Sequence, residues 1–224
     1  MIKIVKVENR DEGNSKAYEI LKDIVDSQTL LALSGGTSPD YHRMIVDPGD
    51  VVLGVICVVD ERYGLPYHEN SNELLLKNSG INDYSDVKGI EYHRILERKD
   101  FYETARDYNQ LMSELLVRFP QKIGVMGIGS NLHTAGIFPH SKAVATNSLA
   151  VAETVEDEFP QRITMTLRAL GEFQHFVILA FGSAKQNALK KMLDEKENDM
   201  QKYPAIFYRK SFAKSYLITD QNLK

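Results

Sequence analysis

The sequence predicts a three-layer α/β fold, in which helices cover both faces of a mostly parallel sheet. Two features of the 224-residue chain indicate this fold. First, four apolar runs are continuous rather than alternating, which is typical of strands that are buried on both faces. Second, segments with helical spacing separate these runs, and this βαβ rhythm favours parallel pairing with helices as the crossovers.

The predicted elements follow in chain order. Residues 1–7, MIKIVKV, alternate with a period of two and indicate a first strand. The next segment predicts an amphipathic helix, with Asn14 or Ser15 as its N-cap and with Ala17, Ile20, Leu21, Ile24 and Val25 on its apolar face. The continuous runs are TLLALS at 29–34, VVLGVICVV at 51–59, KIGVMGIG at 122–129 and HFVILAFG at 175–182. Residues 101–119 and 183–196 fit helices, and the chain shows neither a linker nor a repeat. We therefore predict one Rossmann-like domain over residues 1–224.

Charge and composition argue against several classes of protein. The chain has 27 Lys and Arg against 31 Asp and Glu, whereas a nucleic-acid or anionic membrane surface needs clustered basic residues. No apolar run approaches the roughly 18 residues of a membrane helix, and the N-terminus lacks the pattern of a secretory signal. We therefore expect a cytoplasmic protein. The single cysteine, Cys57, lies inside an apolar run, so we expect a buried core residue and no thiol metal site.

Polar residues follow each of the four buried runs. They are Ser34-Gly35-Gly36-Thr37-Ser38-Pro39 after the first, Asp60-Glu61-Arg62-Tyr63 after the second, Ser130-Asn131-Leu132-His133-Thr134 after the third and Ser183-Ala184-Lys185 after the fourth. In open parallel sheets, ligands bind beyond the carboxyl ends of the strands. We therefore expect these four segments to share one site.

The first of these segments predicts a phosphate site. Gly35 and Gly36 let the backbone turn closely past a ligand, while Ser34 and Thr37 lead into a helix whose N-terminus carries partial positive charge. An ordinary helix start, with Pro39 near its first position, explains the same residues equally well. The GxxxxGK[ST] and GxGxxG patterns of nucleotide sites are absent, which favours a monophosphate.

The other three segments supply charged and titratable groups. Arg62 is suited to bind phosphate with two hydrogen bonds, and Asp60 to take or orient a proton. His133 titrates near neutral pH and is suited to act as a base, and Lys185 is placed to reach an anion. Each residue also has a simpler interpretation, as an exposed turn, a structural histidine or a solvated lysine. Together they predict a site for an anionic small molecule.

In this order, the motifs resemble those of the 6-phosphogluconolactonase family, within the group that includes glucosamine-6-phosphate deaminases. SGGTSP resembles the family's phosphate loop, and DERYGLPYHENSN resembles its Asp-Glu-Arg-Tyr segment. GIGSNLHTAGIFP resembles its Gly-x-Gly-x-Asp-Gly-His-Thr-Ala-Ser-Leu-Phe-Pro segment, and RITMTLRAL and FGSAK resemble its later strand and lysine. The resemblance runs from about Leu30 to Asp220, where YPAIFYRKSFAKSYLITD is similar to the family's closing segment.

The resemblance implies hydrolysis of 6-phospho-D-glucono-1,5-lactone to 6-phosphogluconate, a step of the pentose phosphate pathway. It assigns His133 as the general base that activates water, with Asp60 and Asn131 beside it as catalytic residues. It carries phosphate binding over to Ser34, Gly35, Gly36 and Thr37, and contact with the anionic end of the substrate to Arg62 and Lys185. It implies no metal and no cofactor, a sugar phosphate as the partner, and it leaves a homo-oligomer open.

The chain departs from the family pattern at Asn131 and Leu132, where the family has Asp and Gly. An amide only partly replaces a carboxylate that orients and stabilises a catalytic histidine, and glycine permits backbone angles that leucine resists. Two alternatives therefore stay open. One is a glucosamine-6-phosphate deaminase or isomerase in which Asp60 moves a proton between carbons. The other is a sugar-phosphate-binding protein with weakened catalysis. Arg62 and Thr134 resemble lactonases more than deaminases.

Overall fold

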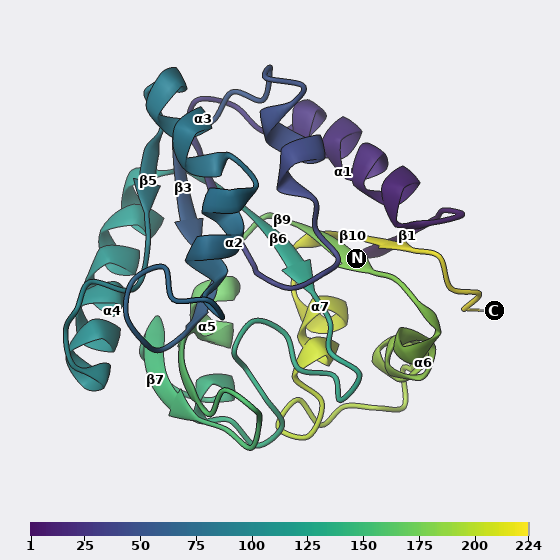
Figure 1. The fold of residues 1–224 in the computed structure, drawn as a ribbon. Coiled ribbons are helices and arrows are strands. Elements are labelled where there is room, and N and C mark those ends of the chain that lie inside the picture. The colour runs from purple at the N-terminus through teal and green to yellow at the C-terminus, as the bar shows by residue number, and fades with distance from the viewer. Residues whose placement is uncertain (224) are drawn as a thin grey trace.

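The central sheet of the computed structural model, which describes residues 1–223, has seven parallel strands (Figure 1). Their spatial order is β1 (Ile2–Lys6), β10 (Lys214–Thr219), β9 (His175–Ala180), β6 (Gln121–Gly127), β2 (Thr29–Leu33), β3 (Val55–Val58) and β5 (Glu91–His93). Each neighbouring pair in this order is parallel. All residues of β2 and β3 are buried, as their continuous apolar sequences predict. The predicted parallel α/β sheet is confirmed.

Helices cover both faces of this sheet, as predicted. They are α1 (Arg10–Ile24), α2 (Asn72–Asn78), α3 (Ile81–Lys88), α4 (Phe101–Arg118), α5 (Leu167–Leu170), α6 (Gln186–Leu193) and α7 (Phe207–Lys210), with the shorter turns η1 (His42–Val46), η2 (Lys142–Val144), η3 (Ser183–Lys185) and η4 (Pro204–Ile206). In Figure 1, α1 lies above the strands β9 and β10, and α7 lies below them. None of the helices among residues 1–223 is long and apolar enough to cross a membrane.

A second sheet, which the sequence did not predict, contributes to the site. It is antiparallel and has the order β4 (Asp60–Arg62), β8 (Gln161–Met165) and β7 (Ala150–Thr154). The chain leaves the main sheet after β3, and Asp60 then pairs with Thr164 of β8. The sequence places residues 60–62 after a buried run and gives no sign of this pairing. These residues form a short strand, because β8 offers them a partner from a distant part of the sequence.

Helix α4 forms as its sequence predicts and joins the two sheets. The Asp100 side chain caps its N-terminus by accepting hydrogen bonds from the backbone N–H groups of Tyr102 and Glu103, both at 3.0 Å. Tyr108, on the buried face of the helix, donates a hydrogen bond to the carbonyl of Val58 in β3. The helix also packs on β7 and β8. It therefore holds the antiparallel sheet against the end of β3.

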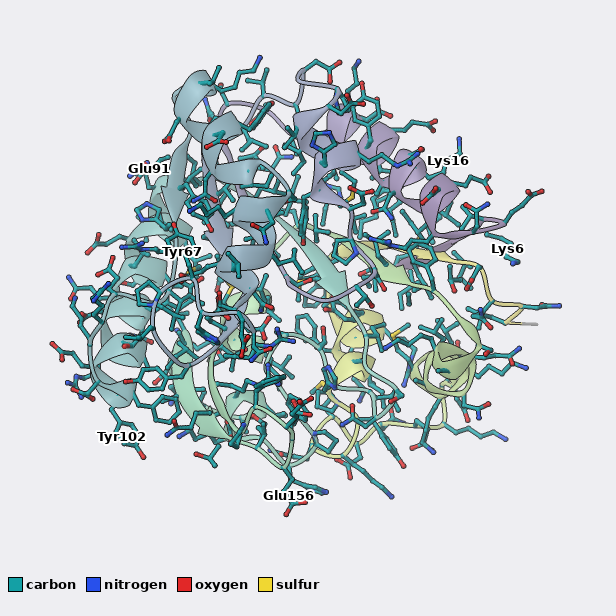
Figure 2. All side chains as sticks on the ribbon, viewed as in Figure 1. Lys6, Lys16, Tyr67, Glu91, Tyr102 and Glu156 are labelled. Carbon is teal, nitrogen blue, oxygen red and sulfur yellow. The ribbon has the colours of Figure 1, made fainter. Side chains whose placement is uncertain are left out.

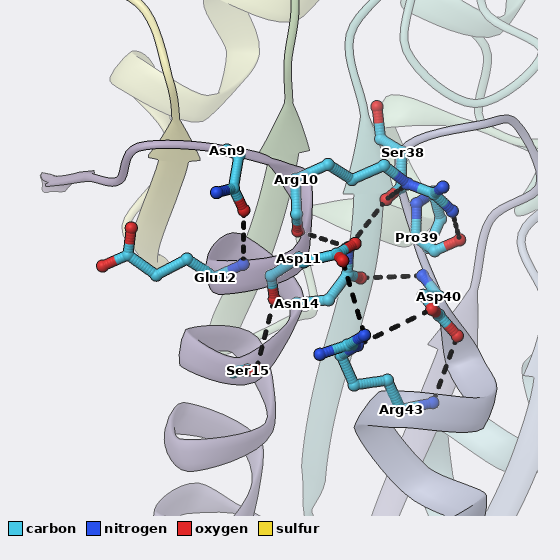
Figure 3. Close-up of polar contacts among 10 residues, drawn as sticks. All are labelled: Asn9, Arg10, Asp11, Glu12, Asn14, Ser15, Ser38, Pro39, Asp40 and Arg43. Carbon is cyan, nitrogen blue, oxygen red and sulfur yellow. Dashed lines mark hydrogen bonds and ion pairs between the residues drawn. The ribbon is translucent and has the colours of Figure 1, made fainter.

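The predicted N-cap of the first helix, Asn14 or Ser15, is wrong. Helix α1 begins at Arg10, and the side chain of Asn9 caps it by accepting a hydrogen bond from the Glu12 N–H at 3.0 Å. Asn14 is fully buried inside the helix and donates to the carbonyl of Ser38 at 3.1 Å. Its Oδ1 also accepts from the Asp40 N–H at 2.7 Å (Figure 3). Asn14 therefore fixes the end of the glycine segment, and these partners lie too far along the chain for a local pattern to show.

Cys57 is fully buried in β3, as predicted. The strand around it is shorter than the apolar run at 51–59, because only Val55–Val58 pair with the neighbouring strands. The helix predicted over 183–196 is also shorter. It begins as the turn η3, continues as α6 from Gln186, and ends at Leu193.

Candidate active site

The residues that follow β2, β3, β6 and β9 line one cavity of about 250 Å³. The lining includes the whole segment 34–39 together with Asp60, Arg62, Asn72, Gly127, Ile128, Gly129, His133, Ala135, Phe138, Asp157, Arg162 and Lys185. The expectation that four strand ends share one site is confirmed. Every residue that the sequence nominates for the site lies in this lining except Asn131, which is hydrogen-bonded to His133.

Two glycines shape the first wall of the cavity, each for a different reason. A Cβ atom on Gly35 would lie 1.8 Å from Oδ1 of Asn72, so the position admits no side chain. Gly36 has a φ of 96°, a conformation that other residues rarely adopt. Among residues 1–223, no acceptor is bonded to the backbone N–H of Gly36, Thr37 or Ser38. Such a turn with free N–H groups is suited to bind an anion.

The helix expected after this segment is a single short turn. Residues 34–40 are irregular, and the turn that follows is a five-residue π-helix, His42–Val46. Pro39 therefore precedes the helix instead of opening it. The side chain of Asp40 accepts a hydrogen bond from the Arg43 N–H at 3.1 Å and so caps the turn that follows. The donors that this segment offers at the cavity are therefore its unbonded N–H groups rather than a helix end.

Strand β4 separates the roles of its two carboxylates. Successive side chains of a strand point to opposite sides, and Asp60 lines the cavity while Glu61 turns away from it. Glu61 accepts hydrogen bonds from the N–H groups of Asn72 at 2.7 Å and Glu73 at 2.9 Å, and so caps α2. Burial raises the pKa of Glu61 to about 8. Glu61 is therefore a structural residue.

Asp60 lines the cavity and is a carboxylate that a ligand can contact. Its side chain is 6% exposed and has no hydrogen-bond partner among the described residues. Burial raises the pKa of Asp60, and the positive charges of Arg162 and Arg62 oppose this rise. A carboxyl group in this environment exchanges a proton more readily near neutral pH than an exposed aspartate does.

His133 is held in one orientation by three neighbours. Its ring stacks on Phe138, with 4.4 Å between the ring centroids and 14° between the planes. Its Nδ1 lies 2.7 Å from Oδ1 of Asn131. A Cβ atom on Gly129 would lie 2.2 Å from the imidazole, so this glycine leaves room for the ring.

The contacts of Asn131 determine which nitrogen of His133 carries the proton. The same Oδ1 also accepts a hydrogen bond from the backbone N–H of His133 at 3.1 Å. Because a backbone N–H only donates, the Asn131 atom that faces it must be the carbonyl oxygen. Nδ1 of His133 must then donate to that oxygen, and Nε2 carries the lone pair. No residue among 1–223 forms a hydrogen bond to this Nε2.

Electrostatics keep the imidazole neutral. Burial lowers the pKa of His133 to about 4, and the positive charges of Lys185 and Arg162 add to this effect. The ring is therefore unprotonated over the physiological pH range. It has the charge state of a base, although the negative charge of Asp157 acts in the opposite direction and favours the imidazolium.

Leu132 stands where the family pattern has a glycine, and its backbone angle is one that glycine adopts more readily. Its φ is 64°, in the left-handed region, which costs a non-glycine residue roughly 1–2 kcal/mol. Its side chain is 4% exposed and packs in the core. Its carbonyl accepts a hydrogen bond from the Ala205 N–H at 3.0 Å. The surrounding contacts therefore hold the leucine in a conformation that it does not favour.

Three cationic side chains reach the cavity from different elements. Arg62 donates from Nη1 to the carbonyl of Asn70 at 2.8 Å and lies over the Phe159 ring. Lys185 forms no ion pair among the described residues, and burial lowers its pKa. Arg162 is 4% exposed, forms an ion pair with Asp157 and lies over the Phe138 ring. This group of charges is suited to a ligand with more than one negative charge.

The sequence reasoning missed Arg162, Asp157 and Asn72 as site residues. Arg162 belongs to the RITMTLRAL segment, which was expected only as a strand, and Asp157 lies on the turn before it. Both reach the cavity through the antiparallel sheet, so a search confined to the ends of parallel strands does not find them. Asn72 opens α2, and its Nδ2 donates to the carbonyl of Asp60 at 2.7 Å.

Comparison with known proteins places the chain among sugar-phosphate enzymes. A family model for glucosamine-6-phosphate isomerases and 6-phosphogluconolactonases matches residues 12–216. A glucosamine-6-phosphate deaminase of Lactobacillus johnsonii is 28% identical over 211 residues, which cover 86% of this chain and 85% of the relative. A 6-phosphogluconolactonase of Synechocystis sp. is 27% identical over 205 residues, which cover 87% of this chain and 83% of the relative.

A solved structure supports the same fold. The 6-phosphogluconolactonase of Trypanosoma brucei matches with a TM-score of 0.81 and 18% identity, over 98% of this chain and 96% of that one. Sequence identity does not separate the two activities, because relatives of both kinds are about equally similar. The family model matches most of the chain, and this match shows the family without deciding between the two activities. The chain belongs to the family of glucosamine-6-phosphate isomerases and 6-phosphogluconolactonases.

Proposed function

We propose that the protein hydrolyses 6-phospho-D-glucono-1,5-lactone to 6-phosphogluconate. The observation that carries the proposal is the state of His133. Its Nδ1 is bonded to Asn131, its Nε2 carries the lone pair, and its ring is neutral at the wall of a cationic cavity. A neutral base with an oriented lone pair is what the deprotonation of water requires. We also expect the protein to act in the cytoplasm, because a phosphorylated substrate does not cross a membrane unaided.

In this reaction, the N–H groups of the glycine segment, Arg62 and Lys185 hold the phosphate. Nε2 of His133 removes a proton from water while the water oxygen attacks C1 of the lactone, and the carbonyl electron pair moves to its oxygen. When this oxyanion collapses, the bond between C1 and the ring oxygen breaks. The ring oxygen then takes the proton from His133, and the carboxylic acid formed at C1 releases its own proton to solvent and becomes a carboxylate. Binding the phosphate far from C1 holds the carbonyl near the base.

The test is the rate of hydrolysis of freshly generated lactone, coupled to oxidation of 6-phosphogluconate and compared with the uncatalysed rate at the same pH. We expect acceleration, and His133→Ala should reduce it by about 10²–10⁴-fold, the usual contribution of a general base. His42→Ala serves as the control, since His42 is exposed and lies outside the cavity lining. An equal loss in both variants, or no acceleration by the folded protein, contradicts the proposal.

A second candidate function is deamination or isomerisation of glucosamine 6-phosphate. Asp60 favours it, because it is a buried carboxyl group that lines the cavity and has no hydrogen-bond partner in the described chain. Such a group is suited to carry a proton between adjacent carbons of an opened sugar. Release of ammonia from glucosamine 6-phosphate measures this activity. If it exceeds lactone hydrolysis and Asp60→Asn removes it, the second candidate replaces the first.

A third outcome is a sugar-phosphate-binding protein with weakened catalysis, for which Asn131 and the left-handed Leu132 are the motivation. This protein would bind 6-phosphogluconate in calorimetry. It would accelerate neither reaction, and His133→Ala would leave the measured rates unchanged.

A further inference from the structure

Arg162 differs from the other cations of the cavity because an internal carboxylate already occupies it. Its side chain is 5% exposed, and its guanidinium forms an ion pair with Asp157. Its Nε is buried and has no hydrogen-bond partner among residues 1–223. Arg62 and Lys185 form no ion pair in the same range. A buried guanidinium in an anion cavity is strongly suited to bind a planar carboxylate or a phosphate.

Asp157 reaches Arg162 from the turn that joins β7 to β8, residues 155–160. The turn is closed by hydrogen bonds from the Asp157 N–H to the carbonyl of Val155 at 3.1 Å and from the Val155 N–H to the carbonyl of Pro160 at 2.8 Å. The side chain of Asp157 is 36% exposed. Its neighbour Glu156 projects away from the ribbon at the lower edge of Figure 2. The carboxylate that pairs with Arg162 therefore comes from a partly exposed side chain on a turn, outside both strands.

One shared contact residue links Arg162 to the proposed base, and so to the reacting end of a ligand. Arg162 lies over the Phe138 ring, with 5.6 Å between the guanidinium carbon and the ring centroid. The same Phe138 stacks on His133 at 4.4 Å. The glycine segment, by contrast, meets Asn72 and lies at the end of β2. Arg162 therefore shares a contact residue, Phe138, with the proposed base.

We propose that Asp157 is an internal competitor, which occupies the Arg162 guanidinium until a carboxylate of the ligand takes its place. This inference deepens the proposed function and rests on it for the choice of ligand. Hydrolysis turns a neutral lactone carbonyl into a carboxylate, so that the product carries one more anionic group than the substrate. With the phosphate held by Arg62 and Lys185, Arg162 is the cation that remains for this carboxylate. Asp157 then weakens the binding of the product and favours its release.

Competition and positioning by Asp157 have opposite consequences. If Asp157 competes with the ligand, its removal makes Arg162 available in a larger fraction of molecules, and the ligand binds more tightly. If Asp157 instead only holds Arg162 in place, its removal loosens the guanidinium and the ligand binds more weakly. The sign of the change in affinity therefore decides between the two roles.

Titration calorimetry with two probes tests the proposal. The probe 6-phosphogluconate carries a phosphate and a carboxylate, whereas glucose 6-phosphate carries the phosphate alone. Asp157→Asn should bind 6-phosphogluconate roughly tenfold more tightly than the unmodified protein does. We expect this size because loss of the competing carboxylate should raise the fraction of molecules with an available Arg162 about tenfold. The affinity for glucose 6-phosphate should change less than about twofold.

Three further variants serve as controls. Glu158→Gln removes one negative charge from the next residue of the same exposed turn, and both affinities should stay within about twofold. Asp157→Glu keeps the competing carboxylate and should keep the original affinities. Arg162→Gln should remove the difference between the two probes. Thermal melting identifies the variants that are folded.

Three results would overturn the inference. They are weaker binding of 6-phosphogluconate by Asp157→Asn, equal tightening by Asp157→Asn and Glu158→Gln, and no binding of 6-phosphogluconate by any folded variant. The experiment does not depend on turnover. If lactone hydrolysis is absent and Asp157→Asn still tightens 6-phosphogluconate selectively, the proposed function fails while the competition stands.

Discussion

The two walls of the cavity hold their shapes by different means. On the phosphate wall, the left-handed backbone angle falls on Gly36, and Gly35 makes space that Asn72 fills. On the wall that carries His133, left-handed angles fall on Leu132 at 64°, the residue before His133, and on Ala135 at 51°, which lines the cavity. The phosphate wall is therefore built from residues that adopt its conformation without strain. The His133 wall depends on surrounding contacts to impose its conformation.

This difference indicates that the two walls can be altered separately. Left-handed non-glycine residues persist only where neighbouring structure fixes them, and such strain gathers at functional sites. Changes on the His133 wall should affect the chemical step, and changes on the phosphate wall should affect affinity.

Replacement of Asn131 should reduce turnover without reducing affinity. Asn131→Leu removes the acceptor that fixes the Nδ1 proton and the orientation of His133, so that Nε2 loses its defined lone pair. We expect kcat for lactone hydrolysis to fall about 100-fold, within the usual contribution of an oriented base, while KM stays within about twofold. Steady-state kinetics measure both constants. A rise in KM at unchanged kcat would assign Asn131 to substrate binding instead.

Replacement of Gly35 should have the complementary effect on affinity. In Gly35→Ala, the new Cβ would lie 1.8 Å from Oδ1 of Asn72, and relief of this overlap must move either the loop or the start of α2. Such overpacking costs roughly 1–3 kcal/mol, so we expect about tenfold weaker binding of glucose 6-phosphate or more. Calorimetry measures this loss.

Gly36→Ala provides the matched comparison for Gly35→Ala. A Cβ at Gly36 meets no atom within 4 Å, and its cost is the φ of 96° alone. We expect Gly36→Ala to weaken binding less than Gly35→Ala does. The reverse order of affinities would show that backbone angle, rather than space for Asn72, shapes the phosphate wall.

The pH dependence of activity should change when a carboxylate replaces the Asn131 amide beside His133. A general base must be neutral, so activity rises as the pH increases through its pKa, which burial and Lys185 lower to about 4. Asn131→Asp places a negative charge beside the ring, favours the imidazolium and should raise this midpoint by roughly 1–3 units. Profiles of kcat/KM against pH measure the shift. Coincident profiles would show that the residue at 131 does not act on the charge of His133.

The same pKa of His133 affects stability with a defined sign. His133 binds a proton below about pH 4 in the folded protein and below its ordinary value of 6.5 in the unfolded chain. Between these values the unfolded chain holds more protons, so stability falls as the pH is lowered from 6.5 to 4. Denaturant unfolding should show a weaker pH dependence in His133→Ala over this window.

The sequence predicts the main sheet well because its signal is local. The runs at 29–34, 122–129 and 175–182 are continuous and apolar, and each coincides with a strand of the parallel sheet to within a few residues. The cavity follows from the same logic, since the ends of parallel strands meet at one edge. The motifs at these ends therefore indicate which residues gather there.

The remaining features depend on pairings between distant segments. The antiparallel sheet forms because Asp60 meets Thr164 across about half the chain, and this pairing brings Arg162 and Asp157 to the cavity. Asn14 has a cap-forming side chain, but its partners at Ser38 and Asp40 draw it into the interior of the helix. Glu61 is adjacent to Asp60 and faces the other way. No local pattern distinguishes these outcomes, because each is decided by a partner far away in the sequence.

Leu132 offers the finest test of how the His133 wall is held. Leu132→Ala keeps the left-handed angle of 64° and loses the buried side chain, whereas Leu132→Gly loses the side chain and relieves the angle. Removing a buried leucine costs about 2–5 kcal/mol, and relief of the angle returns roughly 1–2 kcal/mol. The glycine variant should therefore be about 1 kcal/mol more stable than the alanine variant, although glycine loses more chain entropy on folding. Denaturant unfolding measures the two free energies, and an alanine variant that is the more stable would show that Leu132 bears no strain.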